Sequence, residues 1–218
     1  MHRIRQRLIE ERTALVNQIR GLLAEYGIVM GKGINQARAG LPVILEDGEN
    51  GLTGYGRELF NALREELIEV DERIAGFDKR IAAVHAANPL SQKLAEVEGV
   101  GPMTATAFLA AVVDARQFAN GRQCAAWVGL VSRQDSSGGK TVLLGITKRG
   151  DRYLRTLLIH GARAVLQRSG EKTDARSRWL NGVEARRGHN VAAVALANKN
   201  ARILWALAAA QEPYRKAA

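Results

Sequence analysis

Apolar residues recur in alternating steps of three and four between residues 60 and 84 of this 218-residue chain. This spacing is typical of the a/d seam of a coiled coil, and charged residues stand between the apolar ones. A seam of about 25 residues is marginal by itself and needs a partner. We therefore predict a coiled coil over 57–88, packed on a helix over 3–26 or on a second copy of the chain. The seam comprises Phe60, Leu63, Leu67, Val70, Ile74, Phe77, Ile81 and Val84.

The segments around the seam differ in character. Residues 31–56 hold 7 glycines and an acidic EDGEN run, which favours a long loop with at most one short turn. The pair Asn88-Pro89 marks a domain boundary. Aromatic residues are few, alanine and leucine are plentiful, and there are only 4 prolines, so the composition favours a mainly α protein.

Ser136 and Ser137 stand in a glycine-rich turn between two short apolar runs, residues 125–131 and 141–146. Two such runs joined by a polar connection that contains glycine are typical of a β-hairpin. We therefore predict a small β-hairpin with the serines at its tip. A polar Ser-Ser-Gly-Gly turn is also compatible with an ordinary hairpin that carries no chemistry.

Cations are concentrated directly after the predicted hairpin, where Asp151 can cap the next helix. Backbone N–H groups and the helix dipole already favour an anion at a helix N-terminus. Four cations there cost helix stability, which a bound phosphate would offset. The stretch therefore indicates a phosphate held near a serine hydroxyl. The four are Lys148, Arg149, Arg152 and Arg155; Asp174 and Asn190 can cap two further helices.

A nucleotide-binding P-loop is a competing interpretation of the same stretch. Gly139-Lys140-Thr141 matches the end of that motif. The motif also requires a glycine at position 134, where this chain has Gln134, and a helix after the threonine. We therefore set the P-loop aside.

Residues 94–111 carry a second informative pattern, two predicted helices joined by the turn GVG. This is the helix-hairpin-helix pattern, whose glycines let the turn approach a sugar-phosphate backbone and bind phosphate through N–H groups. Gly99, Gly101 and Thr104 are therefore candidate DNA-binding residues. Structural copies of this hairpin that touch no nucleic acid also exist, so that alternative stays open.

Positive charge is uneven along the chain. Residues 1–89 hold 12 Lys and Arg against 13 Asp and Glu, whereas residues 90–218 hold 20 against 9. This asymmetry favours a polyanionic partner, nucleic acid first and an anionic membrane surface second. A solvated basic surface without a ligand is the alternative.

The single cysteine, Cys124, excludes an internal disulfide framework and suits a reducing compartment. Its apolar neighbours indicate a small core residue. No apolar run is long enough to span a membrane, so we expect a cytoplasmic protein without a membrane partner. The four histidines lack metal-ligand spacing, and we predict no metal site in this chain.

Several motifs occur here in the order found in one family: GVGPMTA, WVGL, SSGGK, ITKRGDRYLRTLLIHGARA and NVAAVALANK. Over essentially its whole length the chain resembles the C-terminal half of insertion-sequence transposases of the one-ten type, particularly the one-one-one-one subgroup. These are DEDD recombinases guided by a bridge RNA.

The resemblance implies a part of a larger enzyme. Such enzymes have a RuvC-like domain whose four carboxylates bind divalent metal, then an oligomerising coiled coil, then a transposase domain with an essential serine. By the resemblance, Ser137 attacks a DNA phosphodiester and becomes linked to it. A serine hydroxyl needs a base, a metal or a dense cationic field for this step. The candidates for that field are Lys140, Lys148, Arg149 and Arg152.

The resemblance also implies limits. Residues 1–30 would be the tail of a missing RuvC-like domain, so the DEDD carboxylates are absent and Mg²⁺ is expected only with that domain. Residues 31–56 would be the glycine-rich loop, 57–88 the coiled coil and 89–218 the transposase domain. Ser132 stands where the family usually has proline. The expected partners are DNA, a structured guide RNA and further copies of the chain; the alternative function is a non-catalytic nucleic-acid-binding or oligomerisation remnant.

Overall fold

The computed structural model describes residues 1–137 and 140–210, without the side chains of residues 137, 140, 141 and 210. The predicted mainly α fold with one small β-hairpin is confirmed. The chain divides into two compact units, and the second begins at Ala82, inside helix α3 (Gly54–Ala87). No helix in the described ranges is long and apolar enough to cross a membrane.

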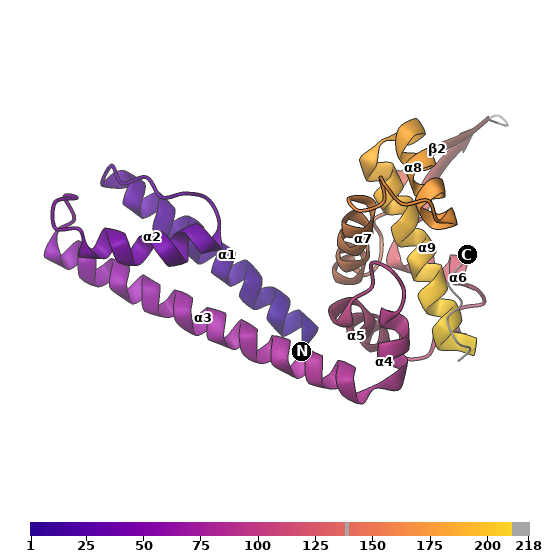
Figure 1. Ribbon diagram of the computed structural model, residues 1–218, viewed down its shortest axis with the longest axis horizontal. Coiled ribbons are helices and arrows are strands. Elements are labelled where there is room, and N and C mark those ends of the chain that lie inside the picture. The colour runs from indigo at the N-terminus through magenta and orange to yellow at the C-terminus, as the bar shows by residue number, and fades with distance from the viewer. Residues whose placement is uncertain (138–139, 211–218) are drawn as a thin grey trace. The chain divides into compact units, whose positions relative to one another are not determined.

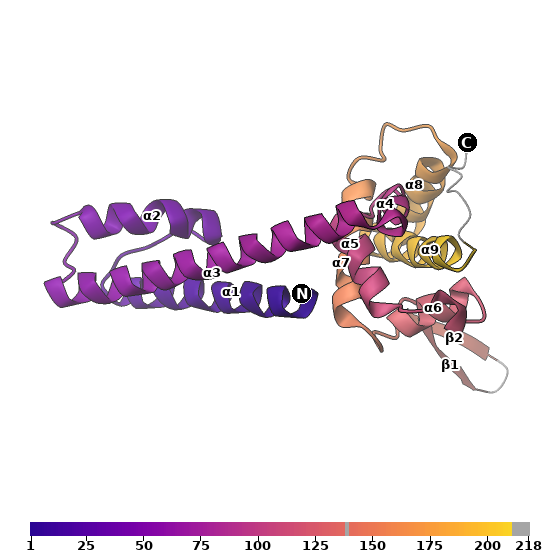
Figure 2. The same ribbon diagram turned by 90° about the horizontal axis from the view of Figure 1, so that it is seen from below.

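In the first unit, α1 (His2–Glu25) and α3 run antiparallel (Figure 1 and Figure 2). Leu8, near the start of α1, packs with Val70 and Ile74 of α3, while later residues of α1 share a core with Phe60. The helix predicted over 3–26 therefore covers the apolar seam within this chain. The buried seam residues are Phe60, Leu67, Val70, Ile74 and Ile81, whereas Val84 is exposed.

The loop predicted over 31–56 is wrong in its middle, where α2 (Ile34–Glu46) is a helix. Only Gly40 of the seven glycines in the segment lies within α2. Ala37 and Leu41 are buried in the core of the unit. Because residues four apart lie on the same face of a helix, their burial stabilises α2 despite the glycines on either side. The acidic run that follows is a turn held by Arg57, which donates to the carbonyls of residues 45 (2.8 Å) and 47 (2.6 Å).

The second unit is built around α9 (His189–Ala210). Its buried face is largely alanine, at positions 192, 193, 197 and 201, so the backbones of neighbouring helices can approach closely. Within the described residues, four α-helices and the short 3-10 helix η1 (Ala115–Gln117) contact α9, and a fifth α-helix, α5, packs on α4 and α7. These α-helices are α4 (Pro89–Ala95), α5 (Pro102–Ala111), α6 (Gly121–Val128), α7 (Arg152–Leu166) and α8 (Ala175–Arg187).

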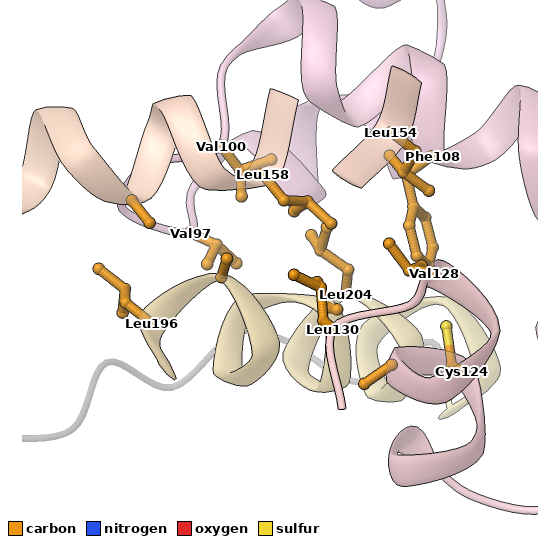
Figure 3. Packing of buried hydrophobic residues seen from close by; sticks show 14 of the residues in the cluster. Val97, Val100, Phe108, Cys124, Val128, Leu130, Leu154, Leu158, Leu196 and Leu204 are labelled. Atoms are coloured by element: carbon orange, nitrogen blue, oxygen red, sulfur yellow. The ribbon is translucent and has the colours of Figure 1, made fainter. Parts of the chain in front are cut away.

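Figure 3 shows the core of this unit, where Phe108 of α5 lies beside Val128 of α6 and Leu154 of α7. Cys124 is fully buried here, which confirms it as a small core residue. Burial raises the pKa of its thiol to about 11. The thiol is therefore neutral and behaves as an apolar group.

The β-hairpin pairs β1 (Ser132–Ser137) with β2 (Lys140–Ile146). It extends away from the helices of its unit (Figure 2). The first strand was predicted in the wrong place, because residues 125–128 end α6, which Gly129 terminates with φ +82°. Ala125, Val128 and Leu130 of that run belong to the helical core, whereas Trp127 is 38% exposed. The true strand is the polar segment SRQDSS, since an exposed ribbon needs no apolar face.

Helix starts follow the predicted caps in two of three cases. The side chain of Asp151 accepts a hydrogen bond from the N–H of Leu154 at 2.9 Å, and Asp174 caps α8. The cap predicted at Asn190 is wrong, because α9 begins at His189 and the N–H of residue 192 bonds the carbonyl of residue 188. Asn190 instead accepts a hydrogen bond from Arg163 at 3.2 Å.

The Asp174 cap makes stability depend on pH. The carboxylate accepts from the hydroxyl of Ser177 (2.7 Å) and from the N–H groups of Ser177 and Arg176 (both 3.1 Å). These bonds, led by the Ser177 hydroxyl, hold the pKa of Asp174 below its ordinary value of 3.8. Because the folded pKa is depressed, the carboxylate contributes stability above about pH 4 and loses it as the pH falls through the folded pKa.

We expect Asp174→Asn to lower the melting temperature at pH 7, with a difference from wild type that shrinks toward pH 3. Thermal unfolding followed by circular dichroism at both pH values measures this. Glu171→Gln removes an exposed carboxylate three residues earlier and serves as the charge control. A difference that is the same at both pH values would show that charge on Asp174 does not matter.

Candidate nucleic-acid interface

The base of the β-hairpin is closed by two backbone contacts that only glycine permits. Gly129 and Gly150 both have positive φ, +82° and +105°. A Cβ on Gly129 would lie 2.0 Å from the carbonyl oxygen of Arg149, and one on Gly150 would lie 1.8 Å from that of Trp127. The chain entering the hairpin and the chain leaving it are therefore in direct backbone contact, which fixes how the hairpin joins α6 and α7.

Lys148 is the one non-glycine residue with positive φ, +55°, in the described part of the chain. Its N–H donates to the carbonyl of Gly129 at 3.2 Å, and the N–H of Thr147 donates to that of Val131 at 2.9 Å. A left-handed lysine costs about 1–2 kcal/mol, so the surrounding contacts must hold it. Strain of this kind is concentrated at functional sites.

The four cations predicted at the start of α7 fall into two groups. Lys148, Arg149 and Arg152 are exposed to solvent. Arg155 is buried, and its Nη1 donates to the carbonyl oxygen of Val128 at 3.0 Å. Three of these cations are thus available to an external phosphate, while Arg155 ties α7 to the end of α6.

The serines lie on the exposed ribbon. The Oγ of Ser136 accepts a hydrogen bond from the side-chain amide of Gln134 at 2.8 Å. Ser137 ends β1, and its backbone pairs with that of Lys140 across the hairpin. The side chains of Ser137 and Lys140, and the two glycines between them, lie outside the described residues.

The three DNA-binding residues predicted at and after the turn between α4 and α5 differ in their exposure to solvent. Gly99 has φ +85° and faces α7, where a Cβ would lie 2.9 Å from the carbonyl oxygen of Gly161. Thr104 is buried in the core of the unit. Gly101, at the start of α5, is exposed. Of the three, Gly101 is exposed, Gly99 is half-buried and Thr104 is buried.

Sequence reasoning missed a cleft of about 1110 Å³ between α6, α9 and the hairpin base. Three exposed cations line it: Arg122 of α6 and Lys199 and Arg202 of α9. Trp179 of α8 also lines it and is 36% exposed. The Nζ atom of Lys199 lies 4.7 Å from the centroid of the Trp179 ring.

One signal in the sequence could have revealed the cleft. Polar residues Asn198 and Arg202 are four apart in a helix otherwise rich in alanine and leucine, and they lie beside the face that buries Ala197, Ala201 and Leu204. Polar residues at helical spacing indicate a solvated face. The contribution of Arg122, 76 positions earlier, depends on tertiary contacts.

Among the described residues, no group of three or more His, Cys, Asp or Glu side chains is placed to hold a metal ion. Neither the acidic turn after α2 nor the four histidines form such a group in the described part of the chain. We therefore assign no metal ligand within the described ranges.

Comparison with known proteins gives consistent matches. Residues 91–178 match the model of a family described as Transposase IS116/IS110/IS902 family. The chain is 51% identical over 216 residues to a probable family 20 transposase of Pseudomonas aeruginosa, covering 99% of this chain and 64% of that protein. It is 50% identical over 213 residues to the transposase for insertion sequence element IS1111A of Coxiella burnetii, covering 98% and 58%. It therefore spans about 60% of the length of these relatives.

Proposed function

This chain belongs to the IS116/IS110/IS902 family of transposases, and we propose that it is the portion that binds DNA and supplies a serine nucleophile, Ser137. The observation that supports the proposal is that the serine pair and the cations are joined to the same hairpin base. The close backbone contacts of Gly129 and Gly150 fix this base, from which the ribbon with the serines extends and next to which the exposed residues Lys148, Arg149 and Arg152 follow in the chain.

The proposed step is a transesterification. The Ser137 oxygen forms a bond to phosphorus, one phosphodiester P–O bond breaks, and the leaving strand takes a proton as its end becomes a hydroxyl. The serine proton passes to a base. Negative charge grows on the phosphoryl oxygens in the transition state, and fixed cations stabilise that charge more than the ground state. We assign this role to Lys140, whose backbone pairs with that of Ser137, and we assign Lys148, Arg149 and Arg152, which lie at the hairpin base about 16 Å along the strand from Ser137, to phosphates further along the DNA.

The remaining parts of the proposal rest on the resemblance. Divalent metal would be supplied with a RuvC-like domain rather than by this chain. A guide RNA and a homo-oligomer formed through α3 would be its further partners.

We expect Ser137→Ala to abolish a covalent protein–DNA adduct in a full-length transposase context, while Ser136→Ala retains it, because only the serine oxygen that bonds phosphorus is indispensable. The measurement is the amount of labelled DNA that stays with the protein after denaturation, with Mg²⁺ present. An adduct that survives in Ser137→Ala and is lost in Ser136→Ala would move the nucleophile by one residue. Adducts in both variants would exclude this serine pair.

The second candidate function is non-catalytic DNA binding, and the observation that favours it is the exposure of Lys148, Arg149 and Arg152 at the hairpin base. It predicts DNA binding without an adduct under any metal condition. Duplex binding across a salt series tests the part that both functions share. We expect Lys148→Ala/Arg149→Ala to weaken binding and to reduce the salt dependence by about one to two phosphate contacts. An unchanged salt dependence would remove these cations from the interface.

A further inference from the structure

We propose that the cleft between α6, α9 and the hairpin base binds an unpaired DNA strand, with Trp179 stacking on a base and Arg122, Lys199 and Arg202 contacting phosphates. The inference rests on the proposed function only for the identity of the ligand as DNA. The residues that support it line the cleft, and neither Ser137 nor the cations at the start of α7 are among them.

The first observation is an uncompensated cluster of positive charge. Gly121 packs against α9 so closely that a Cβ there would lie 3.1 Å from the Cα of Arg202. The next residue, Arg122, lines the same cleft as Arg202, and it stands in the first turn of α6, where the helix dipole adds positive potential. The described part of the chain provides no ion pair for either arginine, and no Asp or Glu is among the residues that line the cleft. Like charges held together in this way favour an anionic ligand.

The second observation is the aromatic surface beside these charges. Trp179 keeps 36% of its surface exposed although it is the residue type that gains most from burial. The Nζ atom of Lys199 covers a face of the ring at 4.7 Å, so a base that stacks on this face takes the place of the ammonium group, which can then contact a phosphate of the strand. A cationic groove with an aromatic platform is the arrangement by which proteins bind single strands without reading their sequence.

The third observation is the size and rigidity of the cleft. Its volume, about 1110 Å³, is above the range of about 300–1,000 Å³ that is typical of small-molecule pockets, which favours an extended ligand. The side chain of Asn198 is held in the cleft by donation from its Nδ2 to the carbonyl of Leu130 at 3.1 Å. An aromatic platform inside a cleft reaches a base only after the base leaves the duplex stack. These features favour an unpaired strand over a duplex.

The test is binding of the whole chain to a labelled single-stranded DNA of about 15 nucleotides, with the duplex and the RNA of the same sequence as comparisons. Fluorescence anisotropy at about 100 mM salt gives the affinities. We expect the single strand to bind more tightly than the duplex. Arg122→Gln/Arg202→Gln should weaken it about tenfold or more and lower the salt slope by about 1.4, since each lost contact accounts for about 0.7.

Two further variants complete the experiment. Trp179→Leu should weaken single-strand binding by about tenfold without changing the salt slope, because it removes stacking and no charge. Arg168→Gln/Arg187→Gln removes the same charge from exposed arginines outside the cleft and should change affinity by less than about twofold. Matching circular dichroism spectra for all variants exclude misfolding as the cause.

The outcomes separate this inference from the proposed function. If the cleft variants bind the strand as well as the Arg168/Arg187 control does, the cleft inference is wrong, and a Ser137-dependent adduct would still support the proposed function. If no adduct forms but the cleft variants lose single-strand binding, the cleft inference is supported and the proposed nucleophilic role of Ser137 is wrong. Tighter binding of the RNA than of the DNA would overturn the assignment of the ligand as DNA.

Discussion

Gly161→Ala is expected to destabilise the second unit by more than about 3 kcal/mol, which for a unit of this size lowers the melting temperature by about 10 °C or more. A Cβ on Gly161 would lie 1.8 Å from the carbonyl oxygen of Gly99. Both partners are backbone, so no side chain can rotate away. The turn between α4 and α5 would have to separate from α7, which would open the core around Val100 and Leu158.

Gly182→Ala is the matched control for this substitution. Gly182 also lies inside a helix, α8, and the nearest atom to a Cβ at this position would be the flexible Nη1 of Arg186 at 3.4 Å. Alanine favours a helix over glycine by about 1 kcal/mol, so Gly182→Ala should be neutral or stabilising. Thermal unfolding of the two variants side by side isolates the Gly99 contact. Equal melting temperatures would mean that the turn and α7 do not pack this tightly.

Arg155→Met is expected to destabilise the second unit by about 2–3 kcal/mol, because it removes a charged donor and leaves a buried carbonyl unpaired. Methionine retains the apolar stem, so the loss reflects the guanidinium and its bond to Val128. Arg152→Met changes the same residue type on the same helix at an exposed position. It should leave stability within about 0.5 kcal/mol and weaken DNA binding.

Measuring unfolding and DNA affinity for both variants assigns each arginine a role. If Arg155→Met melts like the wild type but no longer binds DNA, Arg155 contacts a phosphate and its bond to Val128 is not important for stability. Loss of stability at position 152 would instead indicate that its side chain supports the fold.

Local chemistry made part of the fold predictable from the sequence. Asp151 and Asp174 cap helices because an aspartate bonds N–H groups two or three residues ahead, and the signal lies within one turn. The hairpin was predictable from its glycine-rich turn. Its first strand was not, because a short apolar run suits a buried helix end as well as a strand. The helix α2 was missed because its contacts are with residues distant in sequence.

The candidate site was less predictable, because exposure is decided by tertiary packing. Arg152 and Arg155 look alike in the sequence, yet only Arg152 reaches solvent. Thr104 belongs to the pattern from which DNA contact was predicted, but its side chain is buried. The cleft joins residues of α6, α8 and α9, and no local pattern brings Arg122 to Arg202.

The buried thiol of Cys124 gives the second unit an internal reporter of its own opening. It is the chain's single cysteine, and because its pKa is about 11, almost none of it is thiolate, the form that reacts with alkylating reagents, at neutral pH. Alkylation therefore requires exposure of the core, and its rate measures the equilibrium between closed and open forms. A ligand that binds only the closed form slows this rate in proportion to its occupancy. Protection of Cys124 would thus measure nucleic-acid binding on the unmodified chain.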